Sequence, residues 1–202
     1  MLKNLLKNSK LKSEIKRFYR AHKDEIVDII LFGSSMRGKK KPHDIDLLLL
    51  FKDKENIDLS YELRKKIESF GYRIEITTRT YKNLFESTFL PRESILSEGF
   101  SLILNKKISE ALGYMSFMLF LYSLKGFSSS RRMMFHYALN GREKKKGIIE
   151  ELGGIKLANT AILIPIKVSD EFEDFLNYWN VKFKKVRILI PEKSVKYGEF
   201  KL

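Results

Sequence analysis

The 202-residue chain contains no cysteine and only three histidines. The lack of cysteine excludes a disulfide framework, a thiolate zinc site and a cysteine nucleophile. The small number of histidines disfavours a histidine-rich metal site as well. Any metal ion bound by this chain would therefore depend on carboxylate oxygens for its ligands.

Long apolar runs are missing too. The longest one in the second half of the chain, Tyr114–Tyr122, is interrupted by Ser116 and is far too short to cross a bilayer. The N-terminal stretch MLKNLLKNSKLK has neither the apolar core nor the small-residue cleavage site of a secretory signal. We therefore expect a cytoplasmic protein that does not use a membrane.

Acidic side chains are the minority charge. The chain has 39 Lys and Arg against 25 Asp and Glu, a formal net charge of +14. Residues 1–105 carry 21 basic and 15 acidic side chains, and residues 106–202 carry 18 and 10, so the excess is not confined to a tail. A polyanion such as a nucleic acid or a nucleotide phosphate is a reasonable partner for such a chain.

Hydrophobic periodicity predicts a mixed α/β unit over residues 1–105. The strands are identified by β-branched content and by alternation, and Gly71 is expected to end the second helix. The expected elements, in order, are a helix Lys12–His22, strands Ile26–Phe32 and Asp44–Phe51, a helix Leu59–Phe70, a strand Tyr72–Thr78, and a helical stretch Tyr81–Leu104 broken near Pro91.

Residues 106–202 are predicted to form a second, α+β module that binds the acceptor or a partner. Its expected elements are helices Ser109–Leu124, Ser130–Leu139, Ile148–Leu152 and Asp170–Trp179, with Ser169 as N-cap of the last helix, and strands Ala161–Ile166 and Val186–Ile190. The long aromatic helix is interpreted as core or as a partner surface. Two interpretations stay open for Arg131, Arg132 and Lys144–Lys146: a solvated face, or contact with nucleic acid.

The segment LFGSSMRGKKKPHDIDLLLLF is the most informative part of the sequence. Asp44 and Asp46 stand two residues apart at the start of an apolar strand, so their side chains project from the same face. Two unpaired carboxylates in that position repel each other and are costly to desolvate. A divalent cation removes this penalty, and oxygen-only ligation favours Mg²⁺ or Mn²⁺.

A third carboxylate is available on the next strand. Glu75 alternates with Ile74 and Ile76, so it is expected to point away from the buried face. If this strand lies beside the one that carries Asp46, the three carboxylates suffice for two cations about 3.5–4 Å apart, the spacing that supports in-line phosphoryl transfer.

The turn between the two strands has the features of a phosphate-binding loop. Gly33 allows a phosphate to approach the backbone closely, and the hydroxyl of Ser34 and nearby N–H groups are donors for phosphate oxygens. Arg37 and the run Lys39–Lys41 add positive charge, although a solvated loop accounts for these lysines equally well.

Taken together, these residues resemble the signature of the DNA polymerase β-like nucleotidyltransferase superfamily. Gly33, Ser34, Asp44 and Asp46 match it directly, and Glu75 takes the place of the third carboxylate. The stretch GSSMRGKKKPHDID is close to the form seen in family X polymerases and terminal transferases. The small size of the chain is more like the minimal nucleotidyltransferases of archaea and bacteria. The resemblance covers about residues 26–104.

The resemblance implies a small mixed sheet flanked by helices, an α/β (α+β) catalytic domain over residues 1–105, and a separate module over residues 106–202. It implies the transfer of a nucleoside monophosphate from an NTP to an acceptor hydroxyl, with Mg²⁺ or Mn²⁺ as cofactor and release of pyrophosphate. The residues it assigns are Asp44, Asp46 and Glu75 to catalysis and metal binding, and Gly33, Ser34, Arg37 and Lys39 to the nucleotide.

The acceptor remains a choice between hypotheses. A nucleic-acid end, RNA or DNA, is favoured by the net charge and by the basic second half. A hydroxyl of a partner protein, as in small antitoxin-like nucleotidyltransferases, is the alternative, and a small molecule such as an aminoglycoside ranks third. A non-catalytic nucleic-acid-binding protein of the same fold is disfavoured, because a retired site has no reason to keep three acidic residues together.

Overall fold

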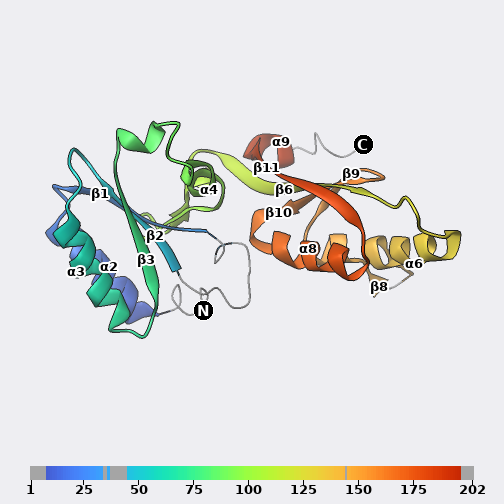
Figure 1. Cartoon of the computed structure of the whole chain (residues 1–202), viewed down its shortest axis with the longest axis horizontal. Coiled ribbons are helices and arrows are strands. Elements are labelled where there is room, and N and C mark those ends of the chain that lie inside the picture. Colours follow the sequence, from blue (N-terminus) through green and yellow to red (C-terminus); the bar gives the residue numbers. More distant parts are fainter. Residues whose placement is uncertain (1–7, 34–35, 37–44, 144, 197–202) are drawn as a thin grey trace. The chain divides into compact units, whose positions relative to one another are not determined.

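The structure is a computed structural model that describes residues 8–33, 36, 45–143 and 145–196 (Figure 1). The chain divides into two compact units, with the boundary between Leu112 and Gly113. Each unit has its own sheet and its own core, and each is described separately below. Among the described residues, no helix is both long and apolar enough to span a bilayer.

The first unit is built on a five-stranded mixed sheet with strand order β3-β2-β1-β4-β5. Strands β2 and β3 are parallel, and every other pair in this sheet is antiparallel. The elements are α2 (Ser9–Ala21), β1 (Ile26–Phe32), β2 (Ile45–Phe51), α3 (Ile57–Glu68), β3 (Ile74–Thr80), η2 (Asn83–Phe85), α4 (Arg92–Glu98), β4 (Phe100–Ser101), β5 (Lys106–Lys107) and α5 (Ile108–Ala111).

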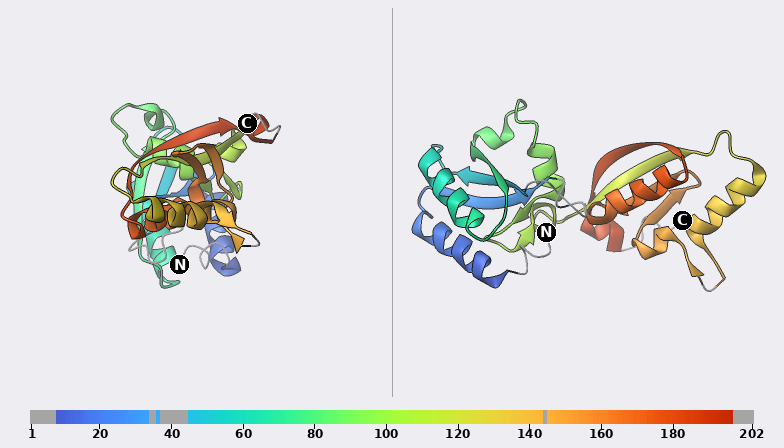
Figure 2. Two further views of the ribbon diagram at one scale, coloured as in Figure 1. Left: turned by 90° about the vertical axis from the view of Figure 1, so that its right-hand side faces the viewer. Right: turned by 60° about the horizontal axis from the view of Figure 1, so that its bottom comes forward.

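Both faces of this sheet are buried near its centre. Helices α2 and α3 lie side by side over one face and pack against alternate residues of β2 such as Leu47 and Leu49 (Figures 1 and 2). Ile95 of α4 packs on the opposite face, against Leu48 and Leu50. Apolar residues on both faces explain why β2 reads as the continuous run LLLLF in the sequence.

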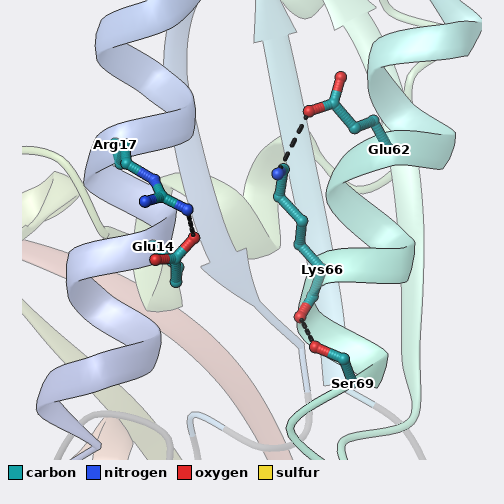
Figure 3. A network of polar contacts seen from close by, with 5 residues as sticks. All are labelled: Glu14, Arg17, Glu62, Lys66 and Ser69. Carbon is teal, nitrogen blue, oxygen red and sulfur yellow. Dashed lines mark hydrogen bonds and ion pairs between the residues drawn. The ribbon is translucent and has the colours of Figure 1, made fainter.

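Side-chain caps set the starts of the two covering helices. Asn8 accepts a hydrogen bond from the N–H of Leu11 (3.0 Å), and Asn56 accepts from the N–H groups of Asp58 and Leu59. Their outer surfaces carry the ion pairs Arg17–Glu14 (2.7 Å) and Lys66–Glu62 (3.4 Å) (Figure 3). Each of these exposed pairs contributes only about 0.3–0.5 kcal/mol, so it is apolar packing that holds the helices on the sheet.

A buried carboxyl joins β1 to β4. Asp28 is 7% exposed, and its Oδ1 accepts hydrogen bonds from Ser101 Oγ (2.8 Å) and from the N–H of Ile29 (2.7 Å). Ser101 Oγ in turn accepts from the N–H of Leu104. Burial raises the pKa of Asp28 above its ordinary value of 3.8, and the two hydrogen bonds offset only part of this rise.

The free energy of unfolding of Asp28→Asn is expected to increase relative to that of the wild type as the pH rises. A raised native-state pKa means that the stability contributed by protonated Asp28 is complete below 3.8 and is lost as the pH rises through the native-state pKa. Asparagine keeps the acceptor oxygen and does not titrate. Urea midpoints of variant and wild type at about pH 3.5 and pH 7 measure this change. If the urea midpoints of variant and wild type differ by the same amount at both pH values, the prediction is wrong. Asp53→Asn, at an exposed position, serves as control.

The second unit has a four-stranded antiparallel sheet with strand order β11-β6-β10-β9, plus a small hairpin β7-β8. Helices α6 and α8 cover one face of the sheet, and α9 packs on part of the other face (Figure 1). The elements are β6 (Tyr114–Ser123), α6 (Ser129–Asn140), β7 (Gly141–Arg142), β8 (Lys145–Lys146), α7 (Ile148–Glu151), β9 (Ile155–Ala158), β10 (Ala161–Pro165), η3 (Ile166–Val168), α8 (Ser169–Tyr178), β11 (Lys182–Pro191) and α9 (Glu192–Lys196).

The predicted fold class, a mixed sheet flanked by helices followed by a second α+β module, is confirmed. The helix expected over Ser109–Leu124 is wrong: only Ile108–Ala111 is helical, and Tyr114–Ser123 is the central strand β6. Alternate residues of β6 enter two different cores, so both sets are apolar and the run has no strand-like alternation of polarity. The interpretation of this segment as a helical partner surface falls with it.

Two smaller expectations are also wrong. The stretch Tyr81–Leu104 is largely irregular, with a short η2 and the seven-residue α4 as its helices and β4 as its strand. Ser169 does not cap α8, because its hydroxyl donates to the carbonyl of Ile166 (2.9 Å) and Val168 occupies the N-cap position. In both places the chain follows tertiary packing and local hydrogen bonds in preference to sequence periodicity.

Candidate active site

Asp46 and Glu75 lie directly opposite each other on the neighbouring strands β2 and β3. The parallel register pairs Asp46 with Glu75, Leu48 with Thr77 and so on along the strands. Residues that pair in this way direct their side chains to the same face of a sheet. The condition on which the predicted third carboxylate depended, that the two strands are neighbours, is therefore met.

The face that carries both carboxylates is the one on which α4 packs. Leu48 and Leu50, which alternate with Asp46 along β2, belong to the core beneath Ile95. Ile74, next to Glu75, is buried in the opposite core, as its alternation predicts. Glu75 is exposed and Asp46 is half-buried, so the pair lies where the buried part of this face opens to solvent.

Gly33, which follows β1, lies against Asp46. Its φ of +82° is in the left-handed region, and a Cβ built at this position would lie 2.1 Å from Asp46 Oδ2. Any side chain here would therefore collide with the carboxylate. The chain needs glycine at position 33 both for the backbone conformation and for the space that Asp46 occupies.

Four of the predicted site residues lie outside the described residues: Ser34, Arg37, Lys39 and Asp44. Gly33, Asp46 and Glu75 are described, and the structure brings these three together. Within the described ranges, no group of three His, Cys, Asp or Glu is placed to hold a metal ion. The complete metal-binding set therefore remains a prediction that includes Asp44.

The donor chemistry of the described pair fits a hard divalent cation. Asp46 and Glu75 provide carboxylate oxygens from adjacent strands, with Leu48 and Thr77 following them on the same face and Arg73 preceding Glu75. Mg²⁺ and Mn²⁺ are held in proteins by a few such carboxylates together with substrate phosphates. The residues present thus fit the cofactor expected from the sequence.

Glu75→Gln is expected to lower nucleotidyl transfer by about a hundredfold, because an amide is a weaker ligand than a carboxylate and removes one negative charge from the site. Binding of the NTP itself should change much less. Steady-state rates and nucleotide titrations separate the two effects. Glu68→Gln, at an exposed position on α3, is the matched control, and a Glu75→Gln enzyme as active as this control would rule out the role.

A groove on the second unit, of about 790 Å³, lies between α6 and the β9–β10 turn. Arg132, Lys156 and His136 are among its lining residues, which include no acidic side chain. Lys156 had no recognisable signal in the sequence, because a single lysine in a four-residue strand fits any solvated position. The full lining is Tyr122, Leu124, Ser129, Arg132, Met133, Phe135, His136, Tyr137, Leu139, Asn140, Lys156, Asn159 and Thr160.

Among the other basic candidates of this unit, Arg131 and Lys146 have structural partners, and Arg132 Nε donates to the carbonyl of Phe127 (3.2 Å). Arg131 donates to the carbonyl of Trp179 (2.8 Å) and lies over the ring of Phe127, 4.2 Å from its centroid. Lys146 forms an ion pair with Glu150 (2.7 Å), and Lys144 lies outside the described residues. Arg131 therefore holds α6 against neighbouring segments, and of the two arginines only Arg132 lines the groove.

Comparisons with known proteins gave one family match and several similar solved structures. The family model described as "Polymerase beta, Nucleotidyltransferase" matches residues 13–107. Among solved structures, one of a mutant of the toxin–antitoxin pair MntA–HpeT is 17% identical and has a TM-score of 0.35, covering 45% of this chain and 70% of that chain. One of a tri-AMPylated HEPN toxin with its MNT antitoxin, from Shewanella oneidensis, is 22% identical with a TM-score of 0.32, covering 45% and 67%.

A search of curated proteins gave no match. The family match spans the sheet β3-β2-β1 and includes Gly33, Asp46 and Glu75, the residues that the structure brings together. Residues 13–107 are therefore similar to the polymerase β type of nucleotidyltransferase domain.

Proposed function

We propose that this protein transfers a nucleoside monophosphate from an NTP to an acceptor hydroxyl and releases pyrophosphate. The observation that carries the proposal is the pairing of Asp46 with Glu75 beside Gly33, within a domain similar to the nucleotidyltransferase family. In the reaction, the acceptor oxygen forms a bond to the α-phosphorus as the bond to the β-phosphate oxygen breaks. The acceptor hydroxyl gives its proton to water in the same step, and pyrophosphate leaves.

The proposed roles follow from chemistry and position. Asp44, Asp46 and Glu75 would hold Mg²⁺ or Mn²⁺, and such an ion, when bound, neutralises phosphate charge and acidifies a hydroxyl. Glu75 is the exposed member of the described pair, which suits contact with an incoming acceptor. The triphosphate would be held by Gly33, Ser34, Arg37 and Lys39.

The main acceptor proposed is a nucleic-acid end. The net charge of +14 and the groove on the second unit, which has cationic lining residues and no acidic one, both favour a polyanion. The alternative acceptor is a hydroxyl of a partner protein. No contact among the described residues favours this acceptor over a nucleic acid.

The test is label transfer from each α-labelled NTP, with Mg²⁺ or Mn²⁺, in a mixture of the protein, total RNA and a primed DNA. We expect label on nucleic acid, and its loss when Asp46→Asn replaces the wild type. Label found on protein and absent from nucleic acid would assign the alternative acceptor. No transfer to any component, with every nucleotide and both metals, would contradict the proposed activity.

A further inference from the structure

The sheet of the second unit has two apolar faces. Met118, Phe120 and Tyr122 of β6 enter the core that α6 and α8 cover. Phe117 and Leu119, which alternate with these residues along β6, belong to an apolar cluster on the other face. An antiparallel sheet with one solvated face normally has polar side chains on that face. Because both faces of this sheet are apolar, we infer that each one packs against another element.

The face covered by α6 and α8 shows which kind of element packs on this sheet. Strands β6, β9, β10 and β11 contain no acidic residue, whereas β11 alone contributes Lys182, Lys184, Lys185 and Arg187. Helix α8 has the complementary composition, with Asp170, Glu171, Glu173 and Asp174 beside the buried Phe172 and Leu176. Glu173 of α8 forms an ion pair and hydrogen bond with Lys185 of β11. An acidic amphipathic helix thus packs on a basic, apolar sheet.

The opposite face of the sheet also combines apolar residues with lysines, but other elements cover only part of it. Its cross-strand rows are Leu119 with Val186 and Leu163, and Leu121 with Lys184 and Ala161. Val195 of α9 belongs to the apolar cluster of this face, together with Ile190 and Leu163. Leu163 is buried (1% exposed), but Leu121 is 46% exposed and Val186 is 53% exposed, so among the described residues an apolar strip on β6 and β11 remains open. Lys182 and Lys184 are exposed at the end of this strip.

We propose that this open strip, formed by Leu119, Leu121, Val186, Lys182 and Lys184, is the docking site for an acidic amphipathic helix of a partner protein. On the face covered by α8, the ammonium group of Lys185 pairs with Glu173. Lys184, the next residue before it on β11, directs its ammonium group to the open face. The apolar rows offer the contact surface, and the two lysines select an acidic helix.

A nucleic acid fits this strip less well than a helix does. Single strands bind to sheet surfaces largely by stacking their bases on exposed aromatic rings. The one aromatic ring that the described strands direct to this face is Phe117, which is 2% exposed. Leucine and valine side chains with two lysines offer no stacking platform. A second copy of the same sheet is disfavoured, because it would bring lysines against lysines.

The probe is a helix-stabilised peptide that carries the sequence of residues 168–179, added to the full-length protein. We expect it to shift the methyl resonances of Leu119, Leu121 and Val186 in NMR spectra and to bind saturably in fluorescence anisotropy. Lys182→Glu/Lys184→Glu should weaken binding about tenfold, since two exposed ion pairs, each weak by itself, are replaced by repulsion. Val186→Asp should weaken it at least as much.

Two controls separate this site from general charge attraction. Lys145→Glu/Lys167→Glu makes the same change in net charge at exposed positions outside the strip and should leave the affinity unchanged. A peptide in which the acidic residues are replaced by lysine should bind the wild type poorly. The same peptide should bind Lys182→Glu/Lys184→Glu better than it binds the wild type, because the charges are then exchanged.

Several outcomes would overturn the proposal. One is equal binding of the acidic and the basic peptide to the wild type. Another is a set of resonance shifts that leaves Leu119, Leu121 and Val186 unchanged. Displacement of the peptide from the strip by a single-stranded RNA or by anionic phosphatidylserine vesicles would reassign the surface. A concentration-dependent dimer in sedimentation equilibrium that Val186→Asp abolishes would assign it to a second copy of this chain.

Discussion

Replacing Asp46 by asparagine is expected to reduce nucleotidyl transfer severely and to leave the fold intact. Asp46 pairs with Glu75 across β2 and β3 and is the most enclosed carboxylate of the described site. The substitution keeps the size of the side chain but removes a charged ligand. Metal-ion stabilisation of a phosphoryl transition state is worth several kcal/mol, so we expect a loss on the order of 10³-fold.

Single-turnover transfer with saturating NTP measures this loss, and Mn²⁺ titration followed by electron paramagnetic resonance measures the accompanying loss of metal binding. Asp53→Asn is the matched control, because Asp53 follows the other end of β2 and is exposed. Circular dichroism and the urea midpoint verify that the variant folds. Unchanged Mn²⁺ binding together with unchanged transfer in Asp46→Asn would refute the assigned site.

Gly33→Ala is expected to damage both activity and stability. An L-residue in the left-handed region costs about 1–2 kcal/mol. The added Cβ would also lie 2.1 Å from Asp46 Oδ2, so the carboxylate or the turn must move. A displacement of about 1 Å at a reacting site commonly costs on the order of 10² in rate. We therefore expect a loss of about that size in transfer, with unfolding at lower urea concentration.

Gly71→Ala provides an internal control for the backbone contribution. Gly71 has a φ of +81°, nearly that of Gly33, and a Cβ there would meet nothing within 4 Å. This variant should lose comparable backbone stability and keep full activity. Comparing urea midpoints and transfer rates of the two variants isolates the contact with Asp46. Equal activities in Gly33→Ala and Gly71→Ala would show that this contact has no role in catalysis.

Several elements of the first unit could be predicted because local and global signals agree there. Strands β1 and β3 alternate or are rich in β-branched residues, so their positions are close to those expected. Strand β6 could not be predicted, because its two apolar faces give no period of two. The short β9 and the β7-β8 hairpin have too few residues to produce any period at all.

The sequence by itself determined the chemistry: the types and spacing of Gly33, Asp46 and Glu75, the absence of cysteine and the excess of positive charge are all visible in it. The tertiary structure decided which of these residues meet. Asp46 and Glu75 are far apart in the chain, and only the pairing of β2 with β3 after α3 puts them opposite each other. Likewise, the open strip on the second sheet exists because β6 and β11 pair in one register, and pairing between distant segments has no local signature.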